Sequence, residues 1–175
     1  VAEIVLDKKK HNELKEAVTK FEKTIKAEHS FTDASLEVKL ENTVAVRNVM
    51  NADFQYKFLR SMYACPNGIY RMTPEIEGLV QTSNNIAKVL VNEGKLSVQC
   101  LTRSSVDTEK TDLANAITSA FELIGASIEF GGNYPGWEPK PDAPIINIMS
   151  ELYEELFKGK SHVSAVHAGL ECGII

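Results

Sequence analysis

Apolar residues recur at intervals of three or four positions in four stretches of the chain, which is the spacing of a helix that buries one face. These stretches are residues 8–28, 51–64, 108–124 and 144–157. The residues predicted to face inward are Leu14, Ala17, Val18, Phe21 and Ile25 in the first helix, Phe54, Phe58 and Tyr63 in the second, Leu113, Ile117, Ala120, Phe121 and Ile124 in the third, and Ile145, Ile148, Leu152 and Leu156 in the fourth.

Small polar residues predict where three of these helices begin, and a glycine predicts where one of them ends. Asn51 or Asp53 suits the N-cap of the second helix, Asp107 that of the third and Asp142 that of the fourth, because their side-chain oxygens can accept from free backbone N–H groups. Gly125 suits the end of the third helix, where a left-handed residue is common.

Alternating apolar and polar residues and short apolar runs predict β-strands in the rest of the chain. Residues 78–91 and 95–103 flank the turn sequence Asn92-Glu-Gly-Lys95, which predicts a hairpin. In its second strand the predicted inward residues are Leu96, Val98 and Cys100. Further strands are predicted at residues 1–6, 35–41, 126–131 and 163–167, with Leu36, Val38 and Leu40 inward in the second of these.

The order of these elements predicts an α+β fold, in which a twisted antiparallel sheet has helices packed on one face. Residues 131–142 contain three prolines and three glycines, so they suit a connection rather than a helix or a central strand. We therefore expect a boundary that divides the chain into domains at residues 1–131 and 132–175. The helix and strand predicted after it are typical of a segment of an α/β domain.

Composition and charge exclude several classes of protein. The chain has 175 residues, with 19 basic and 24 acidic side chains and a net charge of −5, which disfavours nucleic-acid binding. No apolar run approaches the roughly 20 residues that span a bilayer, and no N-terminal secretion signal is visible. Neither nucleic acid nor membrane is therefore an expected partner. Because predicted elements begin at Val1 and end near Ile175, we expect the chain to be part of a larger protein.

The cysteines and histidines do not have the spacing of a metal centre. Three cysteines and four histidines are scattered along the chain, without the close pairs that zinc sites use. An odd number of separated cysteines fits a reducing compartment. His167 and Glu171 could share one helix face, but Gly169 and Gly173 disfavour a continuous helix there. A loop histidine without a metal is the favoured interpretation.

Two places in the chain suit the binding of a small molecule. Arg103 ends a strand beside two serines, where its guanidinium group could hold a carboxylate through two hydrogen bonds. From sequence alone, an ordinary surface ion pair is the more frequent use of such an arginine. The second place is residues 167–173, where a glycine directly after a strand lets a ligand approach the backbone.

Four sequence motifs, taken together and in this order, resemble one family of enzymes. They are Gln81-Thr-Ser-Asn-Asn-Ile86, Cys100-Leu-Thr-Arg-Ser-Ser105 followed by Asp107, Tyr134-Pro-Gly-Trp137, and His167-Ala-Gly-Leu-Glu-Cys-Gly173. The chain resembles the aminoacyl-histidine dipeptidases, also called Xaa-His or cytosol non-specific dipeptidases. These are cytoplasmic enzymes of the di-zinc peptidase superfamily that includes aminoacylase and carnosinase.

The resemblance implies a role for each part of the chain. Residues 1–131 would form the lid domain, which mediates homodimerisation in many relatives, and residues 132–175 would form part of the catalytic domain. Two zinc ions, with manganese or cobalt as possible substitutes, would be bound by ligands outside this chain, as would the catalytic residues. The residues implied to contact substrate are Arg103 and the backbone at Gly169, with Asn85, His167 and Glu171 as further candidates. Ala87 departs from the glycine common in relatives, which weakens the case for Asn85.

The resemblance also implies a reaction, the hydrolysis of Xaa-His and other dipeptides by the whole protein. The chain by itself is then expected to be inactive. An alternative from another class is a non-catalytic α+β module for dimerisation or interaction. A small amino-acid-binding regulatory module would have a similar pattern of elements, but the proline-rich boundary and the helix after it count against that interpretation.

Overall fold

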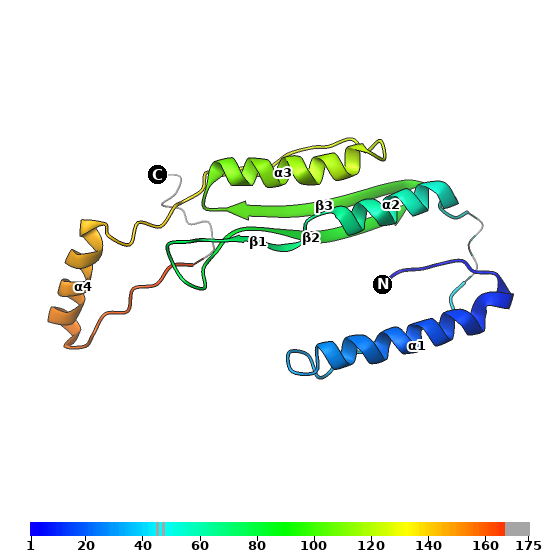
Figure 1. Ribbon diagram of the computed structural model, residues 1–175, viewed down its shortest axis with the longest axis horizontal. Coiled ribbons are helices and arrows are strands. Elements are labelled where there is room, and N and C mark those ends of the chain that lie inside the picture. The colour runs from blue at the N-terminus through cyan, green and yellow to red at the C-terminus, as the bar shows by residue number, and fades with distance from the viewer. Residues whose placement is uncertain (45, 47, 167–175) are drawn as a thin grey trace. The chain divides into compact units, whose positions relative to one another are not determined.

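The computed structural model describes residues 1–44, 46 and 48–166. Their elements are a short 3-10 helix η1 (Lys8–Lys10), α1 (His11–Glu28), α2 (Ala52–Ala64), β1 (Gly68–Met72), β2 (Val80–Asn92), β3 (Lys95–Ser104), α3 (Asp107–Glu122) and α4 (Pro144–Phe157) (Figure 1). The chain divides into two compact units, Val1–Met50 and Asn51–Ile175. All four predicted helices are present.

The first unit consists of α1 and the extended segments that flank it. Leu14, Val18 and Ile25 are half-buried, while Phe21 is exposed. Glu22 pairs with Lys26 at 2.8 Å and accepts a hydrogen bond from the backbone N–H of Val38 at 3.5 Å. The segment after the helix therefore lies along α1.

The strands predicted at residues 1–6 and 35–41 are not formed. Leu36 and Val38 are half-buried as expected, but Leu40 is exposed. The described residues of both segments have no strand beside them. An alternating sequence makes a strand only when another strand accepts and donates its backbone hydrogen bonds, so the prediction from alternation alone was wrong here.

The second unit is built on a three-stranded antiparallel sheet with the order β1-β2-β3. The β2–β3 hairpin pairs Thr82 with Ser104 at one end and Asn92 with Lys95 at the other. Glu93 and Gly94 both have positive φ, 49° and 74°, as a two-residue type I′ turn requires. The predicted hairpin is therefore confirmed.

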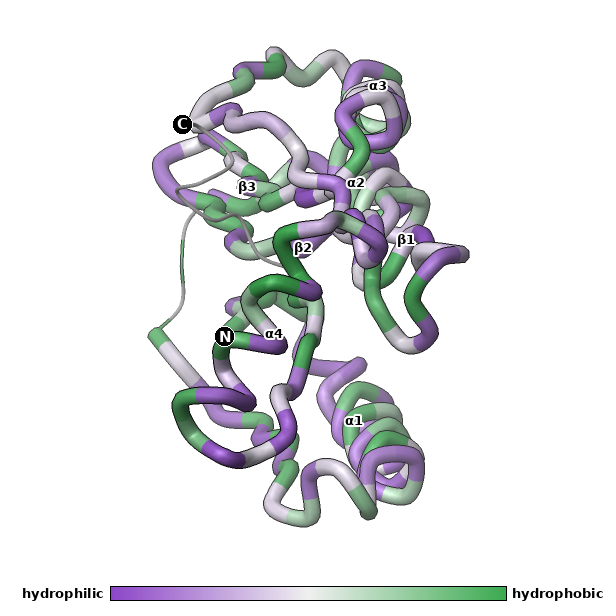
Figure 2. The backbone as a smooth tube through the Cα atoms, turned by 90° about the vertical axis from the view of Figure 1, so that its left-hand side faces the viewer, coloured by the Kyte–Doolittle hydropathy of each residue, from purple (hydrophilic) through white to green (hydrophobic). Residues whose placement is uncertain are grey.

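Helix α3 packs against β3 and β2, and α2 packs against α3, which confirms the predicted α+β arrangement. Leu113 of α3 has no exposed surface, and Phe121 and Phe58 are also buried. Side chains along β3 alternate between half-buried and exposed, and Cys100 is among the half-buried ones. Figure 2 shows the corresponding mixture of hydrophobic and hydrophilic residues along the helices.

One aromatic side chain predicted to be inward faces solvent instead. Tyr63 is 87% exposed, whereas Phe58 is buried and Phe54 is half-buried. At about 100° per residue, a position nine residues after Phe54 lies half a turn away from it on the helix. Tyr63 therefore lies opposite the buried face of α2.

The ends of the helices agree only in part with the predicted caps. Asn51 caps α2, since its side-chain oxygen accepts from the N–H groups of Asp53 and Phe54. After α3, Gly125 has a positive φ of 79°, and the N–H of the next residue, Ala126, donates to the Phe121 carbonyl. This left-handed glycine confirms the predicted helix end.

Two of the predicted N-caps were wrong. The N-cap position of α3 is Val106, and Asp107 is already the first residue of the helix. The N-cap position of α4 is Ala143 rather than Asp142, and Pro144 follows it in the first turn. Proline suits that turn because its fixed φ is helical and no N–H is needed there.

The strands predicted after α3 are also absent from the described residues. Residues 126–131 and 163–166 are irregular, and His167 lies outside the described part of the chain. As in the first unit, the described part of the chain contains no neighbouring strand that pairs with them. The domain boundary expected near residue 132 stays a prediction.

Cys65 is expected to be a slow nucleophile. Its thiol is buried after α2, and burial, with a smaller effect from the neighbouring Cys100 thiol, raises its pKa to about 11. At pH 8 only about one molecule in a thousand then carries the thiolate. We expect iodoacetamide at pH 8 to leave Cys65 unmodified in the folded protein but to modify it in urea, as measured by peptide mass spectrometry. Equal rates in both conditions would contradict this burial.

Candidate functional site

Arg103 lies near the end of β3, on the face of the sheet turned away from α3. Its position in the β2–β3 ladder is opposite Ser83. The side chain is exposed, and no carboxylate among the described residues forms an ion pair with it. The surface ion pair favoured by sequence reasoning is therefore absent within the described part of the chain. The guanidinium group is available to donate hydrogen bonds to an external anion.

A small cavity of about 30 Å³ adjoins Arg103. Its walls come from the start of β2, from the junction between β3 and α3, and from the segment at residues 134–139; the residues include Val80, Ser105, Tyr134 and Trp137. A cavity of this size holds about two water molecules. A carboxylate bound by Arg103 would fit there, while the rest of its molecule would extend outward.

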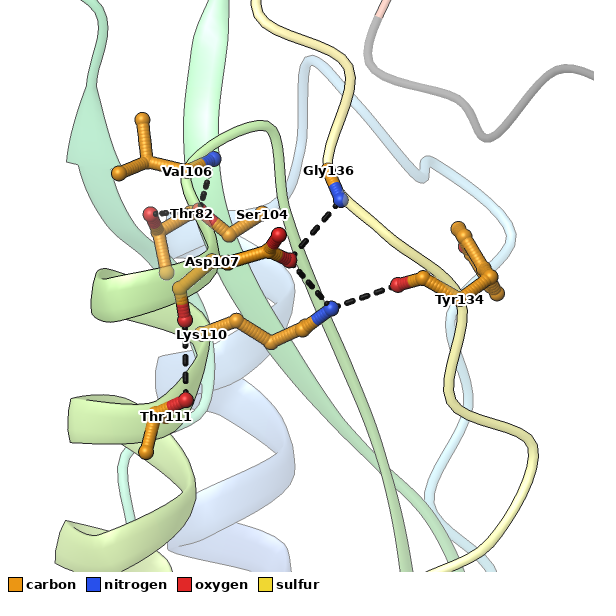
Figure 3. A network of polar contacts seen from close by, with 8 residues as sticks. All are labelled: Thr82, Ser104, Val106, Asp107, Lys110, Thr111, Tyr134 and Gly136. Atoms are coloured by element: carbon orange, nitrogen blue, oxygen red, sulfur yellow. Dashed lines mark hydrogen bonds and ion pairs between the residues drawn. The ribbon is translucent and has the colours of Figure 1, made fainter. Parts of the chain in front are cut away.

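The wall formed by Tyr134-Pro-Gly-Trp137, here called the docked segment, is attached to the first turn of α3 (Figure 3). Lys110 Nζ donates to the Tyr134 carbonyl at 2.6 Å, and Asp107 Oδ1 accepts from the Gly136 N–H at 2.9 Å. Lys110 and Asp107 also pair with each other at 2.8 Å. Asp107 therefore holds a loop that is remote in sequence.

Gly136 has no room for a side chain while the docked segment is in place. A Cβ atom there would lie 2.3 Å from the Ser105 carbonyl oxygen, so alanine would displace the docked segment. We expect Gly136→Ala to cost about 1–3 kcal/mol of unfolding free energy in a urea titration. Gly131→Ala is the matched control, since nothing lies within 4 Å of its Cβ position, and it should change stability little. Equal effects of the two variants would contradict the close contact.

A buried polar network lies under the same strand ends, on the face covered by α3. Glu109 accepts from Gln81 Nε2 at 2.7 Å and from Thr82 Oγ1 at 2.9 Å, and it pairs with Arg71. Thr82 is fully buried and shares a 2.8 Å hydrogen bond with Ser104. Because the single Thr82 proton is donated to Glu109, Ser104 must donate to Thr82.

Sequence reasoning missed this network, although a signal was present. Thr82 and Asn84 occupy alternate positions of β2, and they lie opposite Ser104 and Thr102 of β3. Asn84 is buried, donates to the Pro66 carbonyl at 2.7 Å and accepts from Thr102 at 3.1 Å. A run of polar residues at inward positions of two paired strands is unusual and points to such a network.

Asn85 shares the outward face with Arg103 but lines a different hollow. It lies opposite Leu101 in the ladder and is exposed. The hollow beside it has a volume of about 290 Å³ and is also lined by Ile69 and Val80. Val80 lines the Arg103 cavity as well, so the two hollows are neighbours.

The other candidate residues, His167, Gly169 and Glu171, lie outside the described residues. Val166, the last residue before them, lines the Arg103 cavity. Among residues 1–44, 46 and 48–166, no group of three or more His, Cys, Asp or Glu side chains could hold a metal ion. In the same part of the chain, no helix is long and apolar enough to cross a membrane.

Known proteins that match this chain include a curated relative and a solved structure, each covering nearly the whole chain, although no family model matches. The cytosol non-specific dipeptidase of Escherichia coli (strain K12) is 31% identical over 161 residues, which are 92% of this chain and 33% of that protein. The crystal structure of the aminoacylhistidine dipeptidase from Vibrio alginolyticus matches with a TM-score of 0.90 and 34% identity, over 97% of this chain and 34% of that one. The chain thus spans about a third of the length of each relative.

Proposed function

We propose, because the chain belongs to the family of the aminoacyl-histidine and cytosol non-specific dipeptidases, that it forms the lid and part of the catalytic domain of a dipeptidase. Residues 1–131 are the lid, and residues 132–175 belong to the catalytic domain. The whole protein hydrolyses Xaa-His and other dipeptides in the cytoplasm. This chain contributes to substrate binding and is inactive by itself.

The position of Arg103 is the observation that carries this proposal. A dipeptide ends in a carboxylate, and a guanidinium group binds a carboxylate through two parallel hydrogen bonds. Arg103 is exposed beside a cavity and has no ion-pair partner among the described residues. In the proposal Arg103 holds the substrate carboxylate, with Asn85 on the same face as a weaker candidate.

The metal ions that the family uses have no site in the described residues, which contain no suitable cluster of ligands. It is the resemblance to the family that assigns the metal ions, which would be zinc, to residues outside this chain. No step of the proposed role of Arg103 depends on them. The backbone at Gly169, with His167 and Glu171 in the same turn, stays a predicted contact with substrate.

The test is to replace Arg103 by alanine in the whole protein that contains this chain. We expect kcat/KM for an Xaa-His dipeptide to fall about 100-fold, equivalent to about 2.7 kcal/mol of lost binding to the transition state. Arg60→Ala is the matched control, because Arg60 is an exposed arginine of α2. Its kcat/KM should change less than twofold.

A substrate without the carboxylate makes this test specific. A dipeptide amide should be a poor substrate of the unaltered enzyme, and Arg103→Ala should reduce its turnover little further. If Arg103→Ala leaves kcat/KM for the free dipeptide within twofold, Arg103 does not hold the carboxylate. Turnover of a dipeptide by the 175-residue chain alone, with zinc or manganese added, would contradict its inactivity.

A second candidate function, a module for homodimerisation or interaction, is favoured by the outer edge of β3. This ten-residue strand pairs with β2 on one side and has no strand on the other among the described residues. Such an edge can pair with another chain. Light scattering at high protein concentration tests this use, and a strictly monomeric protein would count against it.

A further inference from the structure

We propose that Asp107 and Lys110 are positioning residues, which hold the docked segment (Tyr134–Trp137) against the end of β3 and thereby fix the wall beside Arg103. The consequence for substrate binding rests on the function proposed above for Arg103. The attachment itself rests on contacts within the second unit and is independent of that function.

The contacts of the two side chains are complementary and specific. The docked segment offers one carbonyl and one N–H group toward α3, and the lysine binds the first while the aspartate binds the second. The 2.8 Å ion pair between them keeps both groups in place (Figure 3). Two different backbone groups are thus bound by one turn of helix.

The burial of Lys110 indicates that its ammonium group serves the docked segment. Its side chain is only 18% exposed, although lysine is among the most exposed residue types. An exposed ion pair between residues three apart on a helix stabilises the helix by only a few tenths of a kcal/mol. The pair with Asp107 is therefore too weak to explain why the lysine side chain is buried. The hydrogen bond from Lys110 to the Tyr134 carbonyl explains this burial, because it brings the docked segment, 24 residues later in the chain, against the lysine side chain.

Asp107 does not occupy the N-cap position of α3, which is Val106, and its carboxylate binds the docked segment instead. The N–H of Val106, at the N-cap position, donates to Ser104 Oγ at 3.1 Å. The first turn is further held by Thr111 Oγ1, which donates to the Asp107 carbonyl at 3.0 Å. The two positioning residues therefore project from a well-supported turn.

The docked segment has little else to order it. Residues 123–140 contain no helix or strand, and fixing such a segment costs about 1–2 kcal/mol of conformational entropy per residue. Gly136 approaches the Ser105 backbone closely only while the segment is docked. Tyr134 and Trp137 line the cavity at Arg103, so release of the segment would remove one of its walls.

The test uses Lys110→Met in the whole protein, with Lys110→Arg as the conservative variant and Lys95→Met as the control. Lys95 is an exposed lysine at the hairpin turn. The protein is labelled with 5-fluorotryptophan, and the fluorine resonance of Trp137 is assigned by its loss in Trp137→Phe. We expect Lys110→Met to shift the Trp137 resonance toward its position in urea and to raise KM about tenfold, with kcat within threefold. Lys110→Arg and Lys95→Met should change neither.

The two readouts separate this inference from the function of Arg103. An unshifted Trp137 resonance in both Lys110→Met and Asp107→Ala would overturn the positioning role, whatever Arg103→Ala does to activity. A shifted resonance with unchanged KM would support the positioning role and count against substrate binding at Arg103. The use of two variants covers the case in which one of them fails to fold.

Discussion

Replacing Leu113 by alanine is expected to lower the free energy of unfolding of the second unit by about 3 kcal/mol. Leu113 is the apolar side chain of α3 with no exposed surface, and it packs in a core in which only Phe58, Cys65 and Phe121 are also buried apolar residues of the described chain. The substitution removes buried surface and leaves a cavity between α3 and the sheet. Because so few side chains form this core, little can move in to fill the space.

The experiment is a urea titration followed by circular dichroism. Leu123→Ala is the matched control, because Leu123 directly follows α3 and is 87% exposed. That variant should change the unfolding free energy by less than about 0.5 kcal/mol, as is usual for surface substitutions. A Leu113→Ala variant as stable as the control would mean that α3 does not pack on the sheet as described.

Replacing Glu109 by alanine is expected to cost a similar amount, about 3 kcal/mol, for a different reason. Its carboxylate accepts hydrogen bonds from Gln81 and Thr82, which are both buried, and it pairs with Arg71. A buried donor left without an acceptor costs about 1–3 kcal/mol. Thr82 can still interact with Ser104, so the amide of Gln81 bears most of the loss.

Urea titrations of Glu109→Ala and of Glu122→Ala would measure this difference. Glu122 is the last residue of α3 and is exposed, so its replacement controls for the loss of one acidic group from the same helix. We expect the control to stay within about 0.5 kcal/mol of the unaltered protein. Similar stabilities for the two variants would show that the network contributes nothing beyond surface charge.

The features that were predicted correctly depend on neighbours in the chain. The hairpin turn at Glu93 and Gly94 needs two residues that accept positive φ, and this need is visible in the sequence. The inward position of Leu113 follows from helical spacing, and the outward position of Arg103 follows from alternation in β3. Each of these depends on residues a few positions apart.

The features that were predicted wrongly depend on residues far apart in the chain. Residues 1–6, 35–41 and 126–131 have strand-like alternation, but no neighbouring strand pairs with them in the described part of the chain. Aspartate is a common residue at helix N-caps, yet the carboxylate of Asp107 binds the N–H of Gly136, 29 residues later. Nothing local distinguishes these two uses of an aspartate.

The sequence by itself determined the helices, the hairpin, the face of the sheet that carries Arg103 and, through its motifs, the dipeptidase family. Local backbone preferences and side-chain periodicity are sufficient for these features, because they act over a single turn of helix or a few residues of strand. Only the tertiary structure decided that Glu109 gathers the polar residues of β2, and that Asp107 and Lys110 hold the docked segment beside Arg103. These contacts join side chains and backbone groups 24 to 29 residues apart, and their formation depends on how the whole unit packs.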